Sequence, residues 1–100
     1  MTTFTQTQLK ELRELAATFY ALKDVVRLEM LSVLAQRECT VNELAEALDK
    51  SQPLISWHLR RLRAVGIVKI RRSGREVHCS LDHEVIQHQQ KEFQQLIGRK

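Results

Sequence analysis

Residues 40–63 read TVNELAEALDKSQPLISWHLRRLR, and this stretch decides the fold. Thr40 and Glu43 have the spacing of a capping box, in which two side chains satisfy backbone amides at the start of a helix. A short helix is therefore expected from this point to Leu48. The apolar residues within it fall on one helical face, which we expect to be buried.

A second helix is expected after a break of about three residues. Ser51 is a suitable cap, and Pro53 falls in the first turn, where its missing amide hydrogen costs little. The helix should run to about Val65, where Gly66 ends it. Two helices joined by so short a break, the second polar at its start and basic at its end, are typical of a helix-turn-helix, here at about 40–65.

Two short strands are predicted next, at residues 67–71 and 76–81. Gly74 lies between them and supplies the positive φ that a tight hairpin requires. Three arginines surround the tip of this hairpin. A basic hairpin that directly follows a helix-turn-helix is a wing, which we place at about residues 67–81.

Helices are also expected on both sides of this unit. Apolar residues recur every three or four positions over 7–22 and again over 83–97. Asp24 is the predicted cap of a further helix that ends at Arg37-Glu38. The predicted fold is mainly α with a small β-hairpin: one winged helix-turn-helix domain over residues 1–100, in the order helix, helix, short strand, helix, helix, strand, strand, helix.

The charge of the chain is unevenly distributed. Eight basic residues and no acidic ones lie between Lys50 and Arg75, whereas the rest of the chain carries eight basic and twelve acidic residues. An acidic body with a strongly basic segment is the electrostatic pattern of a protein that binds a polyanion. The alternative is a solvated basic face without a partner.

Other classes of protein fit the composition poorly. No apolar run approaches the roughly 18 residues of a membrane span, and residues 1–6 lack the features of a secretory signal. Two cysteines are too few for a disulfide scaffold, so we expect a reducing, cytoplasmic setting without a membrane partner. No nucleophile–base set or phosphate-binding loop is visible, and we expect no enzyme activity.

Helical geometry sorts the residues of the second helix of the pair. Steps of 100° per residue place Ile55, Leu59 and Leu62 on one side, the expected core seam. Trp57 is then expected to project outward among arginines, toward a DNA major groove; the alternative is packing against a neighbouring loop. The opposite side carries Pro53, Ser56, Trp57 and Arg60, with Arg61 and Arg63 beside them.

Roles on DNA follow from side-chain chemistry. Gln and Arg read adenine and guanine bidentately, and an apolar group can touch a thymine methyl, whereas helix amino termini and wing arginines suit phosphates or a minor groove. His58 is included in the interface, although it lies nearer the core and could hold the helix instead. The predicted DNA-binding residues are Ser51, Gln52, Pro53, Ser56, Trp57, His58, Arg60, Arg61, Arg71, Arg72 and Arg75.

These residues resemble the recognition segment of ArsR/SmtB repressors. Ser56-x-His58-Leu59-x-x-Leu62 matches the core pattern of that family, and Asp24-x-x-Arg27-Leu28 is similar to its upstream signature. The resemblance implies a homodimer that is held by the helices at 7–22 and 83–97. It also implies a repressor that occupies a roughly palindromic operator on double-stranded DNA until an unidentified inducer releases it.

Many members of that family bind metal, but the residues here depart from their ligand pattern. The family positions fall at Thr40, Asn42, Asp82, Glu84, Gln95 and Gly98, and only Asp82 keeps its type. We therefore expect no metal and no cofactor; the inducer stays unidentified, and a redox or sulfur species is one candidate for it. Two alternatives remain open: a metal-responsive repressor with a non-standard site of His83, His88 and Glu92, and a winged-helix module that binds protein instead of DNA.

Two cysteines are candidates for such a response. Cys39 lies just before the capping box, where winged folds have a short strand that pairs with the second wing strand, and Cys79 lies on that second strand. Opposed Cβ atoms on paired strands are about 4.5–5.5 Å apart, slightly wider than the roughly 3.8 Å of a disulfide. A redox switch is one interpretation, and two small buried fillers is the other and the favoured one.

Overall fold

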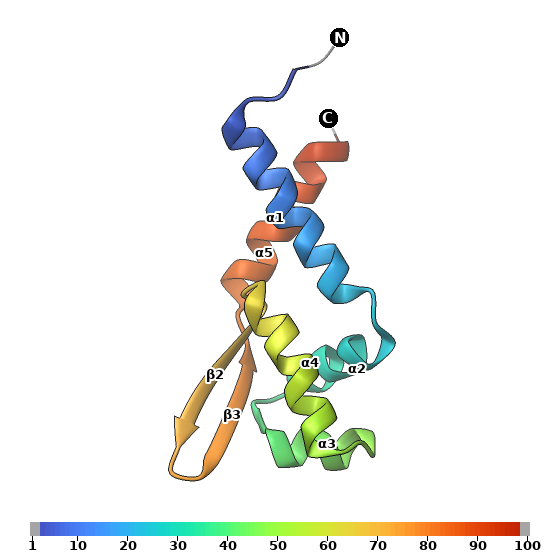
Figure 1. The fold of residues 1–100 in the computed structure, drawn as a ribbon, viewed down its shortest axis with the longest axis vertical. Helices are drawn as coiled ribbons and strands as arrows, with labels where there is room; N and C mark the ends of the chain where they lie inside the picture. Colours follow the sequence, from blue (N-terminus) through green and yellow to red (C-terminus); the bar gives the residue numbers. More distant parts are fainter. Residues whose placement is uncertain (1–2, 99–100) are drawn as a thin grey trace.

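The computed structural model describes residues 3–98, and the order of its elements is the predicted one. Four helices and the hairpin lie close to their predicted bounds. Figure 1 shows the wing projecting from the body of the domain, beside the helix-turn-helix. The elements are α1 (Gln6–Leu22), α2 (Val25–Leu34), β1 (Cys39–Thr40), α3 (Val41–Leu48), α4 (Gln52–Ala64), β2 (Val68–Ser73), β3 (Glu76–Leu81) and α5 (His83–Ile97).

The predicted helix caps are confirmed. The Glu43 amide donates to Thr40 Oγ1 at 3.1 Å, and the Thr40 amide donates to Glu43 Oε1 at 2.8 Å, which completes the capping box of α3. The Ser51 hydroxyl accepts from the Leu54 amide at 3.3 Å at the start of α4. Each bond satisfies an amide that the first turn of a helix leaves without an intrahelical partner.

The predicted end of α2 is wrong. The helix ends at Leu34, several residues before Arg37-Glu38, and the chain turns over residues 35–37. This early exit lets Cys39 enter β1, where it pairs with β3. The sequence is polar from Gln36 to Glu38, so the helix ends where its apolar pattern ends, and the following residues lead into the third strand of the sheet.

The sheet has the strand order β1-β3-β2, and both pairs are antiparallel. In the hairpin, Val68 is opposite Leu81 at one end and Ser73 is opposite Glu76 at the other. Only two residues connect the strands, and the first of them, Gly74, has φ +62°, a conformation that glycine adopts without a steric penalty. The predicted strand at the cysteine is also confirmed, since Cys39 is opposite Cys79.

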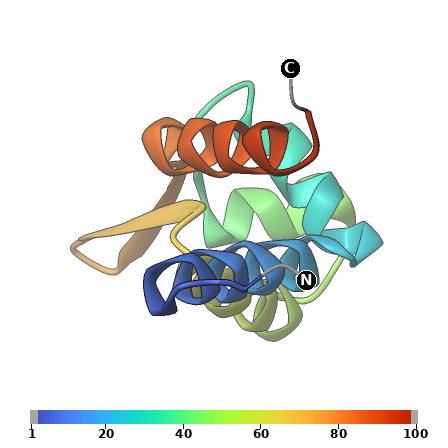
Figure 2. The ribbon, with the colours of Figure 1, turned by 90° about the horizontal axis from the view of Figure 1, so that it is seen from above.

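The core lies where α2, α3 and α4 meet the sheet. The predicted seam of α4 is confirmed, because its three residues are fully or almost fully buried. In contrast, α1 and α5 run side by side and extend away from this core, and α5 contributes no buried residue (Figures 1 and 2). The result is an elongated molecule of 53 × 23 × 20 Å. The residues with almost no exposure are Met30, Cys39, Leu44, Ile55, Leu59, Leu62 and Cys79.

Over residues 3–98, no helix combines the length and the apolar character needed to cross a membrane.

Candidate nucleic-acid interface

The outward face of α4 carries most of the predicted contacts. Its buried seam packs on the core, which leaves the remaining side chains on the solvent side of the helix. Ser56 is half-buried, and the others are exposed: Ser51, Gln52, Pro53, Trp57, Arg60 and Arg61. The helix thus presents a polar start and a basic end on a single accessible face.

His58 does not belong to that face. Its side chain is only 4% exposed, and its Nδ1 accepts a hydrogen bond of 3.0 Å from Arg27 Nε. Burial lowers the pKa of His58, with the charge of Arg27 acting in the same direction and that of Asp24 opposing it. His58 is therefore not accessible to DNA, contrary to its place in the predicted interface. Instead it links α4 to α2 through its hydrogen bond with Arg27.

Trp57 is 40% exposed and is held on its other side. Its ring meets the His58 ring edge to face, with centroids 5.0 Å apart. The guanidinium carbons of Arg61 and Arg27 lie 5.0 and 5.3 Å from the Trp57 centroid, within cation–π range. The buried side of the Trp57 ring thus packs against α2 and α4 instead of a neighbouring loop, and its exposed part faces outward.

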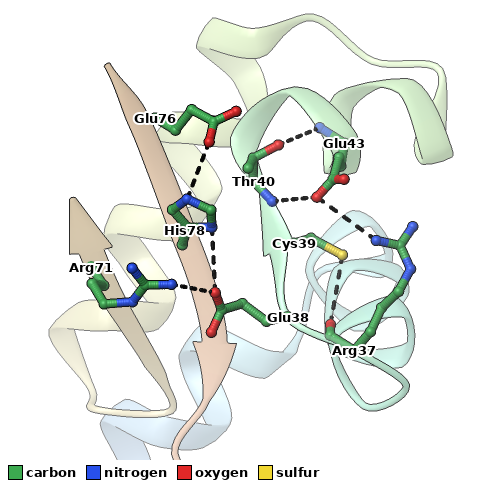
Figure 3. A network of polar contacts seen from close by, with 8 residues as sticks. All are labelled: Arg37, Glu38, Cys39, Thr40, Glu43, Arg71, Glu76 and His78. Carbon is green, nitrogen blue, oxygen red and sulfur yellow. Dashed lines mark hydrogen bonds and ion pairs between the residues drawn. The ribbon is translucent and has the colours of Figure 1, made fainter. Parts of the chain in front are cut away.

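The wing arginines differ in what they contact. Arg71 Nη2 donates to Glu38 Oε2 at 2.7 Å, so one of the three already has an acidic partner (Figure 3). Arg72 and Arg75 are exposed, and neither forms an ion pair within residues 3–98. These two arginines are therefore the wing charges most available to a polyanion.

Glu38 is the centre of a polar network that joins the wing to the base of the helix-turn-helix (Figure 3). His78 on β3 lies between two carboxylates, with Nδ1 3.3 Å from Glu38 and Nε2 3.3 Å from Glu76. On the other side of β1, Arg37 lies 3.8 Å from Glu43 of the capping box. Sequence reasoning missed Glu38 because it precedes the basic segment and meets that segment only through sheet pairing.

The two cysteines are buried and their thiols are free. Burial raises the pKa of Cys79 to about 11, and the pKa of Cys39 is also raised by burial. The Cys39 thiol donates a weak hydrogen bond to the Arg37 carbonyl at 3.6 Å. A reactive cysteine needs thiolate character and access, and this environment supplies neither.

The described chain does not bring together a metal site. Between residues 3 and 98, no three His, Cys, Asp or Glu side chains lie close enough to hold an ion. His88 and Glu92 do share a face of α5, at 3.4 Å, but His83 does not join them. The alternative site therefore has at most two of its three ligands together within one chain.

A winged helix-turn-helix with an exposed basic reading helix defines the class of protein, and comparisons with known proteins agree. The model of a family described as bacterial regulatory protein, arsR family, matches residues 24–69. The HTH-type transcriptional regulator KmtR of Mycobacterium tuberculosis (strain ATCC 25618 / H37Rv) is 42% identical over 66 residues, which are 66% of this chain and 51% of that relative.

Two further proteins are similar over most of their length. The transcriptional repressor SdpR of Bacillus subtilis (strain 168) is 32% identical over 69 residues, 69% of this chain and 77% of that protein. The homodimeric winged helix-turn-helix DNA-binding domain Mb0332 of Mycobacterium bovis, solved in solution, superposes with a TM-score of 0.78 at 26% identity, covering 92% of this chain and 86% of that one.

The chain belongs to the ArsR family. Both relatives and the family model are described as regulators, so the prediction that the chain is not an enzyme is confirmed. The chain spans about half the length of several curated relatives that it matches.

Proposed function

We propose that the chain is a transcriptional repressor that binds double-stranded DNA sequence-specifically through α4 and the wing. The observation that carries this proposal is the accessible face of α4, where polar, aromatic and basic side chains lie together, with two wing arginines that form no ion pair among residues 3–98. A helix of this kind fits the major groove, and a basic hairpin beside it reaches the neighbouring backbone.

Each side chain has a role that its chemistry supports. Gln52, Trp57 and Arg60 lie on the exposed face of α4, where Gln and Arg read base edges and the indole contacts thymine methyl groups. The amides of the first turn favour a phosphate because of the helix dipole. Arg72 and Arg75 contact phosphates or an adjacent minor groove, which fixes the register without reading sequence.

The proposed active form is a homodimer held by α1 and α5. Both helices leave large apolar side chains exposed, and α5 has no fully buried residue although its Phe93 ring contacts the Phe19 ring of α1 at 5.0 Å. The similar domain from Mycobacterium bovis is described as homodimeric. Dimerisation would place two α4 helices about one DNA turn apart, which suits a roughly palindromic operator. The proposed place of action is the cytoplasm. The exposed apolar residues are Phe19, Tyr20, Phe93, Leu96 and Ile97 on these helices, and Phe4 just before α1.

Release by an oxidant or sulfur species acting on Cys39 and Cys79 is a second candidate for regulation. One observation favours it: the two residues are opposed across β1 and β3, where a disulfide would link the wing to the start of α3. Their burial and raised thiol pKa values oppose it, because the thiolate is the reactive form. We therefore favour a structural role for both cysteines.

The proposed function is tested by DNA binding across a salt series. Fluorescence anisotropy with a labelled random duplex of about 30 base pairs should show affinity that falls linearly with salt on logarithmic axes. Selection from a random pool should then enrich a palindromic sequence that binds more tightly. Absence of binding at low salt would overturn the proposal and favour a protein-interaction module.

A further inference from the structure

Arg27 is a buried cation that forms no ion pair with an acidic residue of the described chain. Its side chain lies on α2 and the residue is 6% exposed, yet no carboxylate of residues 3–98 forms an ion pair with it. The Asp24 carboxylate is occupied with the Arg27 backbone amide, at 3.2 Å, as the cap of α2. Because a buried charge without an ion pair is costly, the other contacts of this guanidinium need an explanation.

Three elements converge on the Arg27 side chain. Nη1 donates to the Ala21 carbonyl near the end of α1 at 3.1 Å, and Nε donates to His58 Nδ1 on α4 at 3.0 Å. The guanidinium carbon also lies 5.3 Å from the centroid of the Trp57 ring. One side chain on α2 thus contacts the last turn of α1 and two successive residues of the reading helix.

The hydrogen bond to His58 defines the state of that imidazole. Arginine only donates, so Nδ1 must carry a lone pair and the proton of the neutral ring must lie on Nε2. The lowered pKa of His58, caused first by burial, agrees with a neutral ring. Arg27 therefore fixes both the orientation and the tautomer of His58.

The position of Trp57 depends on the same two residues. Its ring packs edge to face on the His58 ring and receives the Arg27 guanidinium, with Arg61 as the third neighbour. The side chain that we assign to the groove is therefore held from behind by Arg27 and His58, which are both buried. Its exposed part can be presented at a defined angle only while these contacts persist.

We propose that Arg27 is a positioning residue for sequence recognition: by holding neutral His58 and the Trp57 ring, it sets the angle at which Trp57 meets the DNA groove. This inference rests on the proposed function of α4. It assigns a part in recognition to a residue that lies on α2 and is nearly inaccessible to DNA.

The first test is Arg27→Met, which keeps an unbranched side chain but removes the charge and the donors. The substitution removes a buried charge but also leaves His58 Nδ1 and the Ala21 carbonyl without this donor, so we expect a lower thermal midpoint and compare DNA binding well below it. Affinity for a duplex selected from a random pool should fall about tenfold, the size of losing one base contact. Affinity for random duplex, and its salt dependence, should stay as in the unchanged protein because no phosphate contact is lost.

A matched pair at His58 provides the second test. Asn places an amide oxygen close to the position of Nδ1, whereas Gln places it near Nε2, so His58→Asn keeps an acceptor for Arg27 and His58→Gln moves it away. We expect His58→Asn to keep most of the preference for the selected duplex and His58→Gln to lose it. The reverse order, or equal losses, would overturn the proposal.

A readout without DNA separates this inference from the proposed function. Trp57 is the only tryptophan, so acrylamide quenching reports on its environment alone. Quenching should increase in Arg27→Met and His58→Gln but little in His58→Asn. If the unchanged protein fails to bind DNA, the proposed function fails while the quenching still tests the contacts; if Arg27→Met has unchanged quenching and an unchanged preference for the selected duplex, the positioning role is refuted.

Discussion

An ion pair of 2.7 Å joins Glu38, just before β1, to Arg71 on β2. Both side chains are substantially exposed, so the pair is worth only about 0.2–1 kcal/mol. A DNA phosphate can therefore compete with Glu38 for this arginine. Because His78 also lies against Glu38, the same carboxylate links two wing strands to the segment that leads into α3.

Neutralising this carboxylate should strengthen DNA binding. In Glu38→Gln, Arg71 becomes available to a phosphate, so affinity for random duplex at low salt should rise about two- to fivefold, and the salt slope should steepen by about 0.9. The control is Glu46→Gln, the same change at an exposed residue of α3 that forms no ion pair in the described chain. A gain of equal size in the control would show that net charge, and not release of Arg71, is responsible.

Two arginine substitutions should distinguish contacts to the DNA backbone from contacts to the bases. Arg72→Ala removes a wing charge that has no acidic partner among residues 3–98, so all sequences should bind more weakly and the salt slope should become shallower by about 0.9. Arg60→Ala should instead cost about 1–3 kcal/mol on the selected duplex and relax the preference at one base position. The measurement is anisotropy on selected and random duplexes; unchanged affinity in both variants at low salt would contradict the assigned interface.

The dimer is tested by a charge on α5. Leu96 is 51% exposed, and Leu96→Asp should shift the sedimentation of the protein from dimer to monomer because a carboxylate would be buried at the interface. Binding to a palindromic duplex should weaken with it. The matched control is Val25→Asp on α2, an apolar residue that is 73% exposed and outside the proposed interface, which should remain dimeric. Dimers of equal stability in both variants would place the interface elsewhere.

The sequence predicted local features well because local signals specify them. Capping residues placed the starts of α3 and α4, Gly74 placed the turn of the wing, and helical periodicity found the buried seam. The end of α2 was placed too late because no glycine or proline marks it. The exit is set by the pairing of Cys39 with Cys79, forty residues away in the chain.

The candidate site shows the same division. Helical geometry placed Trp57 outward and His58 toward the core, but it could not supply their partner, since Arg27 is 31 residues from His58. Glu38 was missed for a similar reason: a single acidic residue outside the basic segment gives no sign that it will meet Arg71, 33 residues later. Contacts between distant segments depend on the tertiary fold, which no local pattern specifies.

The neutral state of His58 predicts a dependence of stability on pH. Its pKa is lower in the folded chain than the roughly 6.5 of an unfolded chain, so below that pH the unfolded state binds more protons. The contribution of His58 should therefore be present above about pH 6.5 and be lost as the pH falls through the folded value. Protonation would remove the Nδ1 acceptor and place a second cation beside Arg27, an effect that Asp24 only partly offsets.

Urea unfolding between pH 5 and 8 measures this effect, with His58→Asn as the control that lacks the titrating group. The difference in unfolding free energy between the two proteins should shrink as the solution is acidified. A difference that stays constant over the range would mean that His58 is not held neutral by its surroundings.

The last prediction concerns Cys39 and Cys79. They are opposed across β1 and β3 and almost completely buried, and burial raises the pKa of Cys79 to about 11. At pH 7 only about one Cys79 thiol in ten thousand is then a thiolate, the form that attacks oxidants and alkylating agents. Native protein should therefore react slowly with iodoacetamide at both positions, and unfolding in urea should make both react at the rate of a free thiol.

DNA binding should accordingly be insensitive to the state of these residues. Reduced protein, protein treated with peroxide or persulfide, and Cys79→Ala should bind the selected duplex with equal affinity. Cys79→Ala should lower the thermal midpoint because it leaves a small void in a well-packed core. An intramolecular disulfide in the mass spectrum of treated protein, together with weaker DNA binding that reductant restores, would instead establish a redox switch that ties the wing to the base of α3.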